Sequence, residues 1–221
     1  MAGYYNEEAG NKAVEWIERY CTHVKGELGG KPFILEDWQK DDIIRPLFGT
    51  LRSDGLRQYR QAYIEVPRKN GKSNLCAAIA LYMLFADGEP GAEIISAAGD
   101  RNQARIVFEI ASAMCANNPK LSGHGKVLRN SIHYKNSFYK AISAEANTKH
   151  GFNAHAVILD ELHVFPDRDL YDVLKTSTGA RTQPLVIAIT TAGHDTSSIC
   201  YELHDYAQKV KEGSVEDDTF L

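Results

Sequence analysis

From residue 60 onward, the hydrophobic residues of the chain follow two alternating periods. Short continuous apolar runs predict buried strands at 63–66, 94–98, 156–159 and 185–189. Between them, 75–86 is an uninterrupted apolar segment long enough for a helix, and apolar residues recur at helical spacing in 104–114 and 199–210. Strands that alternate with helices are typical of a mostly parallel sheet with crossover helices on its faces. The pattern therefore predicts an α/β fold with a central sheet flanked by helices.

The first 58 residues lack this alternation. Four apolar residues, spaced three or four positions apart, predict an amphipathic helix over 6–25. A second helix is predicted to run through Leu47 until the turn at 53–55. We therefore interpret residues 1–58 as a small N-terminal helical cap and residues 59–221 as the main α/β domain.

Two further segments interrupt or end the α/β pattern. Between 127 and 142, short apolar-polar alternations separated by polar turns predict a β-hairpin insertion or an antiparallel sheet edge. The last helix is predicted over 196–211, and a new apolar run begins at 219–221.

Composition excludes several classes of protein. Hydrophobic residues make up 43% of the chain and charged residues 24%, as in ordinary globular proteins. No apolar run reaches the about 18 residues that a membrane span needs, and the first residues do not resemble a signal peptide, so we expect a cytoplasmic protein without membrane contact. The four cysteines show no C-x-x-C spacing, which predicts buried thiols. A net charge of −4 argues against a static DNA-binding module.

Residues 66–73, Val-Pro-Arg-Lys-Asn-Gly-Lys-Ser, lie between a predicted strand and a predicted helix. They match the phosphate-loop pattern G-x-x-x-x-G-K-[ST] except that Val66 replaces the first glycine. In such a loop, backbone N–H groups face an anion, Lys72 reaches the β- and γ-phosphates, and Ser73 binds Mg²⁺. The alternative is a polar turn without a ligand. The residues that we expect to line the nucleotide are Pro67, Arg68, Lys69, Asn70, Gly71, Lys72, Ser73 and Asn74.

Two more polar segments follow buried strands. The run 156–159 leads into Asp160 and Glu161, where Asp160 would bind Mg²⁺ and Glu161 would act as the general base that activates water. Alternatively, Asp160 only caps the next turn. The run 185–189 ends in Thr190 and Thr191, whose hydroxyls are candidates for contact with the γ-phosphate or the attacking water. With the phosphate loop, these segments predict a P-loop NTPase of the ASCE type that uses ATP and Mg²⁺.

The motifs at 67–73, 157–163 and 190–193, in this order, resemble those of the ATPase domain of the large terminase subunit of tailed double-stranded DNA phages, in the HK97-like group. The loop with Pro-Arg-Lys and without its first glycine is typical of that family. The resemblance runs from about Phe33 to the end of the chain. It implies that residues 35–39 form an adenine-binding motif, in which Gln39 bonds the base and Trp38 packs beside it. The alternative for this segment is a helix start with a core tryptophan.

The resemblance also implies roles for basic residues. Arg68 would contact the γ-phosphate from within the same subunit. Family members carry an Arg-Gly pair before the acidic strand, which reaches a neighbouring subunit's nucleotide as an arginine finger. The matching place here has Lys149 and His150, which lack the planar fork of arginine. Arg101 and Arg105 are the alternative candidates for this finger.

The function implied by the resemblance is that of an ATP-hydrolysing motor. Such a domain would assemble as a ring, expected to be a pentamer, at the portal vertex of a procapsid in the host cytoplasm. There it would move double-stranded DNA, with the portal protein and the small terminase subunit as partners. Full-length terminases continue into a nuclease domain for which this chain offers no room, so we expect no DNA cleavage.

Other functions stay open at the level of the sequence. One is a helicase or RecA-like DNA-dependent ATPase. Another is a nucleotide-dependent portal-binding assembly module with little turnover. A P-loop kinase is disfavoured, because Glu161 directly after Asp160 suits the activation of water and the chain has no arginine-rich lid.

Overall fold

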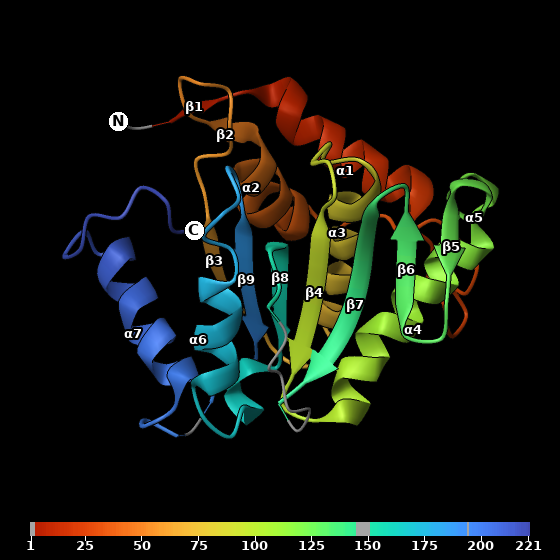
Figure 1. The fold of residues 1–221 in the computed structure, drawn as a ribbon. Coiled ribbons are helices and arrows are strands. Elements are labelled where there is room, and N and C mark those ends of the chain that lie inside the picture. The colour runs from red at the N-terminus through yellow and green to blue at the C-terminus, as the bar shows by residue number, and fades with distance from the viewer. Residues whose placement is uncertain (1–2, 145–150, 194) are drawn as a thin grey trace.

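The computed structural model describes residues 3–144, 151–193 and 195–221. Within these residues, seven strands form one sheet in the order β3-β9-β8-β4-β7-β6-β5 (Figure 1). The strands β3, β9, β8, β4 and β7 run parallel, whereas β6 and β5 are antiparallel additions at one edge. The predicted mostly parallel α/β sheet is confirmed. Its strands are β3 (Gln61–Glu65), β4 (Glu93–Ala98), β5 (Gly125–Val127), β6 (Ser131–Tyr134), β7 (Ser137–Ser143), β8 (Ala154–Asp160) and β9 (Leu185–Thr190).

Helices cover both faces of the sheet. Helices α3 (Lys72–Phe85) and α4 (Arg101–Asn117) pack on one face, and α6 (Asp169–Thr176) and α7 (Ile199–Lys211) pack on the other (Figure 1). Successive side chains of a strand point to opposite faces. Accordingly, Ile158 of β8 packs in the cluster that contains α3 and α4, while Leu159 packs in the cluster that contains α6 and α7. The unbroken apolar run of β8 thus reflects burial on both faces.

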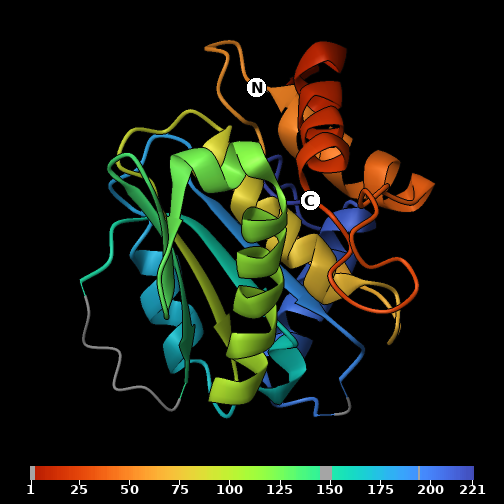
Figure 2. The same ribbon diagram turned by 90° about the vertical axis from the view of Figure 1, so that its right-hand side faces the viewer.

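The N-terminal segment lies beside α3 and contains α1, η1, α2 and the short β1–β2 pair (Figure 2). Ala13, Val14 and Ile17 of α1 belong to the same buried cluster as α3. The division at residue 58 stays a prediction, but one continuous apolar core joins the two parts. The bounds of these elements are β1 (Tyr4–Tyr5), α1 (Glu7–Tyr20), η1 (Gln39–Ile44), α2 (Arg45–Gly49) and β2 (Thr50–Leu51).

The prediction that the first helix extends over 6–25 is wrong. The helix ends at Tyr20, because Cys21 adopts an extended backbone conformation and the chain then folds back, with a bridge between Thr22 and Pro32. The last helix begins at Ile199 rather than at 196, because the Ser198 side chain accepts a hydrogen bond from the Tyr201 N–H and caps it. Local capping therefore sets the start of the last helix, whereas the end of the first helix is set by the chain folding back.

The predicted hairpin region is confirmed as an antiparallel edge. Strands β5, β6 and β7 form two successive hairpins, and β7 then pairs parallel with β4. The helix α5 (Pro119–His124), which precedes them, was not expected. At the opposite edge, Leu221 donates a backbone hydrogen bond to Gln61 O at 2.9 Å, and Tyr63 donates one to Leu221 O at 2.9 Å. Residues 219–221 thus continue the sheet beside β3.

The four cysteines are buried free thiols, as predicted. None of the helices in the described residues is long and apolar enough to cross a membrane.

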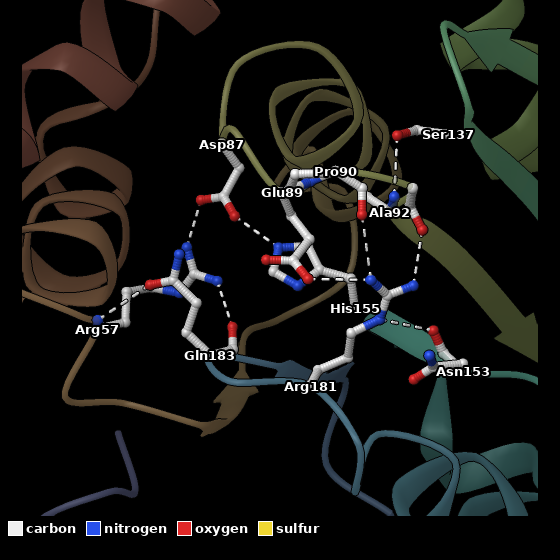
Figure 3. A network of polar contacts seen from close by, with 11 residues as sticks. Arg57, Asp87, Glu89, Pro90, Ala92, Ser137, Asn153, His155, Arg181 and Gln183 are labelled. Carbon is white, nitrogen blue, oxygen red and sulfur yellow. Dashed lines mark hydrogen bonds and ion pairs between the residues drawn. The ribbon is translucent and has the colours of Figure 1, made fainter.

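A buried polar network lies at the amino-terminal ends of the parallel strands (Figure 3). Arg57 forms an ion pair with Asp87, and the Nε2 atom of His155 lies 2.6 Å from the second oxygen of the same carboxylate. Arg57 also donates to Gln183 O at 2.6 Å. Nearby, the Arg181 guanidinium donates to Asn153 O, Glu89 and two carbonyls of the turn at 90–91. These contacts connect the segment that precedes β3 to the turn after α3 and to the starts of β8 and β9.

Candidate nucleotide-binding site

The three sequence motifs meet because their strands are parallel neighbours. Strand β9 lies between β3 and β8, with Glu65 opposite Thr190 and Asp160 opposite Ile189. The carboxyl ends of parallel strands face the same edge of a sheet, which is where ligands bind in open α/β folds. The phosphate loop, the acidic pair and the Thr190–Thr191 segment therefore share one edge, the lower edge in Figure 1.

The phosphate loop turns sharply into α3. Lys69 and Gly71 both adopt left-handed backbone conformations, with φ of 70° and 73°. Gly71 is the residue before the first turn of α3, and a glycine adopts this conformation without the steric cost of a Cβ atom. Arg68, Lys69 and Asn70 are exposed, whereas Lys72 is buried. The loop thus presents the amino-terminal end of a long helix, which favours an anion.

Lys72 links the loop to the acidic strand end. Its ammonium Nζ lies 3.4 Å from Pro67 O and 3.5 Å from Glu161 Oε1. The side chain is only 5% exposed, so this charge is held in one place by the surrounding residues. A bound phosphate would offer the Lys72 ammonium a further anionic partner at the start of α3.

Asp160 has the features of a cation ligand. Its Oδ1 atom is buried and has no hydrogen-bond partner in the described part of the chain. Burial raises the pKa of Asp160 to about 6, with the charge of Glu161 adding to the shift and Lys72 and the Ser73 hydroxyl opposing it. An oxygen donor of this kind suits Mg²⁺, which takes one or two protein oxygens together with phosphate and water. The residues present therefore fit a Mg²⁺ ion held through Asp160 and Ser73.

Glu161 lies between Lys72, His163 and Thr191, and its two carboxylate oxygens face different groups. Oε1 faces Lys72, while Oε2 lies 3.3 Å from His163 Nδ1 and 3.5 Å from Thr191 Oγ1. The backbone of Glu161 has a φ of 52°, an unusual conformation for a residue with a side chain. Such strain often marks functional positions. The side chain is 25% exposed and thus accessible to water.

The two threonines at the end of β9 occupy different positions. Thr190 is fully buried, and its Oγ1 donates to Thr191 O at 2.9 Å and accepts from the His163 N–H at 3.2 Å. The hydroxyl of Thr191 faces Glu161 instead. Of the two hydroxyls considered for contact with the γ-phosphate or water, the one on Thr191 lies near the acidic pair.

Gln39 is brought to the phosphate loop from the N-terminal segment. A Cβ atom built on Gly71 would lie 3.8 Å from Gln39 Nε2. The Gln39 side chain is buried, and its Oε1 accepts from the Glu36 N–H at 3.0 Å, which fixes the orientation of the amide. Trp38 is partly buried against the main apolar cluster. Both residues of the expected adenine motif thus lie in or beside the core, with Gln39 next to the loop.

The structure describes only two of the four residues considered for the arginine finger. Lys149 and His150 lie outside the described residues. Arg101 and Arg105 are exposed on α4, where Arg105 pairs with Glu109 at 2.7 Å. Sequence reasoning assigned no role to His163, which contacts Glu161, Thr190 and Thr191. Its only signal in the sequence is its position two residues after the acidic pair.

Comparison with known proteins gives the family. The model of the family "Terminase large subunit, ATPase domain" matches residues 37–209. This chain belongs to that family. The terminase large subunit of Enterobacteria phage HK97 is 34% identical over 212 residues, which cover 92% of this chain and 40% of that protein. The terminase domain described here thus spans less than half of that relative.

Solved terminase structures agree with the fold. The crystal structure of the HK97 large terminase matches with a TM-score of 0.80 and 29% identity, over 96% of this chain and 43% of that one. A structure of the large terminase from a thermophilic bacteriophage in complex with ADP matches with a TM-score of 0.54 and 10% identity, over 74% of this chain and 39% of that one. The terminase domain therefore has the predicted P-loop NTPase fold.

Proposed function

We propose that this terminase domain hydrolyses ATP with Mg²⁺ at the edge of the sheet formed by β3, β9 and β8. In this proposal, the phosphate loop binds the phosphates, and Lys72 contacts the β- and γ-phosphates. Ser73 and Asp160 hold Mg²⁺, which would neutralise charge on the phosphates. Glu161 takes a proton from the attacking water, and Thr191 lies beside it.

The arrangement of Glu161 carries this proposal. Its Oε1 lies 3.5 Å from Lys72 Nζ, so the expected base and the expected phosphate ligand are neighbours. A polar turn without a ligand would not need a buried lysine and a buried aspartate beside each other. The thermophilic phage terminase determined with ADP supports nucleotide binding by this fold.

Lys72→Ala tests the proposal. We expect the variant to remain folded and to lose Mg²⁺-dependent phosphate release, because its loop lacks the charge that meets the phosphates. Phosphate release from ATP measures turnover, and a thermal unfolding curve shows whether the variant is folded. Lys209→Ala, which removes a lysine that is about half exposed on α7, is the matched control and should behave as wild type. Unchanged turnover in Lys72→Ala would contradict the site.

Arg68→Lys tests the expected γ-phosphate contact. Lysine keeps the charge but not the planar fork with several N–H donors. We expect turnover to fall by about tenfold, the effect of about 1.4 kcal/mol on the barrier, while nucleotide affinity changes less. Steady-state turnover and nucleotide titration separate the two. Arg129→Lys, an exposed arginine between β5 and β6, is the control. A loss of affinity with unchanged turnover at saturating ATP would instead assign Arg68 to uniform binding of the nucleotide.

For the adenine base, we propose that Gln39 is the hydrogen-bonding residue and Trp38 the packing residue. The closeness of Gln39 Nε2 to Gly71 supports this assignment. For a finger in trans, Lys149 and His150 stay candidates alongside Arg101 and Arg105.

We further propose that the ATPase drives double-stranded DNA into a procapsid. In this role, the domain forms a ring, expected to be a pentamer, at the portal vertex in the host cytoplasm, with the portal protein and the small terminase subunit as partners. Membership of the terminase family and the similarity to the HK97 protein support the proposal. DNA protection from nuclease inside procapsids, measured in a packaging reaction that contains this protein, tests it. Duplex unwinding without packaging would favour a helicase instead.

We also propose that residues 1–221 alone do not cleave DNA. Incubation of a supercoiled plasmid with the purified chain and Mg²⁺ or Mn²⁺ should leave it intact.

A further inference from the structure

His163 lies among three side chains of the site. It belongs to the short helix η2 (Leu162–Val164), which Glu161 connects to the end of β8. Its Nδ1 atom is 3.0 Å from Thr190 Oγ1, 3.4 Å from Thr191 Oγ1 and 3.3 Å from Glu161 Oε2. One ring nitrogen thus faces the expected base and both threonines at the end of the neighbouring strand β9.

The hydrogen bonds around Thr190 determine which atom carries the proton. The Thr190 hydroxyl donates its only hydrogen to Thr191 O at 2.9 Å. In its contact with His163 Nδ1, the hydroxyl must therefore accept. The Glu161 carboxylate, when ionised, is also an acceptor only. The hydrogen bond with Thr190 consequently requires an N–H at Nδ1 of His163, and the Glu161 carboxylate, whose Oε2 lies 3.3 Å from Nδ1, favours the same proton position.

The backbone strengthens the same connection. The backbone N–H of His163 donates to Thr190 Oγ1 at 3.2 Å, so His163 contacts this hydroxyl through both its backbone N–H and its ring Nδ1. A Cβ atom built on Gly193 would lie 3.2 Å from the His163 Cβ. Glycine at 193 thus allows the segment after Thr191 to pass close to His163. The side chain of His163 is 18% exposed.

We propose that His163 is a positioning residue that ties the Glu161 carboxylate to the Thr190–Thr191 segment. The inference rests on the proposed ATPase function. In it, the Nδ1–H of His163 holds Oε2 of Glu161 in place and leaves Oε1 for water when Lys72 turns to a phosphate. Because the same N–H reaches Thr190, a shift at the end of β9 also moves the base. His163 therefore couples the position of the Glu161 base to the position of strand β9, which leads into α7.

Two substitutions of His163 separate positioning from simple packing. In His163→Asn, the amide NH₂ reaches about the place of Nδ1, so we expect turnover within about threefold of wild type. In His163→Leu, a side chain of similar bulk has no donor, and turnover should fall by about 10- to 100-fold, the size of loss that misplacement of a reacting group causes. Nucleotide affinity and thermal stability should change little in both. His124→Asn, an exposed histidine at the end of α5, is the control.

A second measurement does not depend on turnover. In the chain with ¹⁵N-labelled histidine, long-range ¹H–¹⁵N correlation spectra show which ring nitrogens carry protons. We expect a protonated Nδ1 in His163, assigned by comparison with His163→Asn. A bare Nδ1 would overturn the proposal, because it cannot donate to Thr190 or Glu161.

The two measurements distinguish the possible failures. Turnover at the wild-type rate in His163→Leu, or equal losses of turnover in the Asn and Leu variants, overturns the positioning role and leaves the ATPase proposal intact. No turnover in the wild-type chain under any condition contradicts the ATPase proposal, and the proton at Nδ1 still decides whether His163 forms this connection.

Discussion

Glu161→Gln is expected to abolish measurable ATP turnover while ATP still binds. The glutamine side chain has the same size and its carbonyl accepts a hydrogen bond from Lys72, but the amide cannot take a proton from water. A positioned general base contributes a factor of about 10² to 10⁴ to a rate, which corresponds to about 3–5 kcal/mol in the barrier. The loss should therefore appear in kcat, whereas the nucleotide dissociation constant should stay close to the wild-type value.

Phosphate release at saturating Mg²⁺ and ATP measures the first quantity, and titration with a fluorescent nucleotide measures the second. Glu109→Gln, in an exposed pair on α4, is the control and should turn over ATP as the wild type does. Normal turnover in Glu161→Gln would remove Glu161 from the role of base. A parallel loss of binding and turnover would instead assign it to holding the phosphate loop through Lys72.

Asp87→Asn is expected to cause the largest loss of stability outside the site. Asp87 is buried between Arg57 and His155, with a side chain only 5% exposed. Removing one partner of a buried ion pair leaves the other charge without compensation, which typically costs about 3–5 kcal/mol. The free energy of unfolding at pH 7, measured by urea denaturation, should fall by this amount. An exposed pair contributes about 0–1 kcal/mol, so Asp205→Asn on α7 is the control.

The same variant has an expected pH dependence. Burial alone would raise the pKa of Asp87, but Arg57 and His155 outweigh burial and hold the pKa below its ordinary value. The stability from the ionised carboxylate is therefore present above the unfolded-state pKa of about 3.9 and is lost as the pH falls through the lower pKa of the folded state. The difference between wild type and Asp87→Asn should shrink on acidification in that range. A difference that stays constant, or one below about 1 kcal/mol at pH 7, would show that the network of Figure 3 does not stabilise the fold in this way.

Several features of the site were accessible from local sequence, because they follow from the order of residues along one strand or helix. The apolar runs before Val66, Asp160 and Thr190 predicted three buried strands, and the structure contains all three. Asp100, a residue type that favours helix caps, directly precedes α4, and its carboxylate accepts from the Asn102 and Gln103 N–H groups. These are short-range effects, in which the period of hydrophobic residues and the hydrogen-bonding capacity of one side chain determine the result.

Other features depend on contacts between distant segments. Nothing in the sequence indicates that Asp87 and His155 share a buried ion pair with Arg57, since Asp87 lies 30 positions from Arg57 and 68 from His155. The end of the first helix was also mispredicted, because apolar spacing continued beyond Tyr20 while the chain turned back to pair at Thr22 and Pro32. In both cases, the deciding contact is made with a residue outside the segment whose apolar spacing gave the prediction.

The sequence by itself determined the motifs of the site, the α/β pattern and the resemblance to terminases, since each is a local arrangement of residue types. Only the tertiary structure decided how the motifs relate. The order of the strands places β9 between β3 and β8, so Thr191 rather than Thr190 faces Glu161 and His163 contacts all three residues. The physical reason is that strand order and side-chain orientation result from packing on both faces of the sheet, which involves residues from the whole chain.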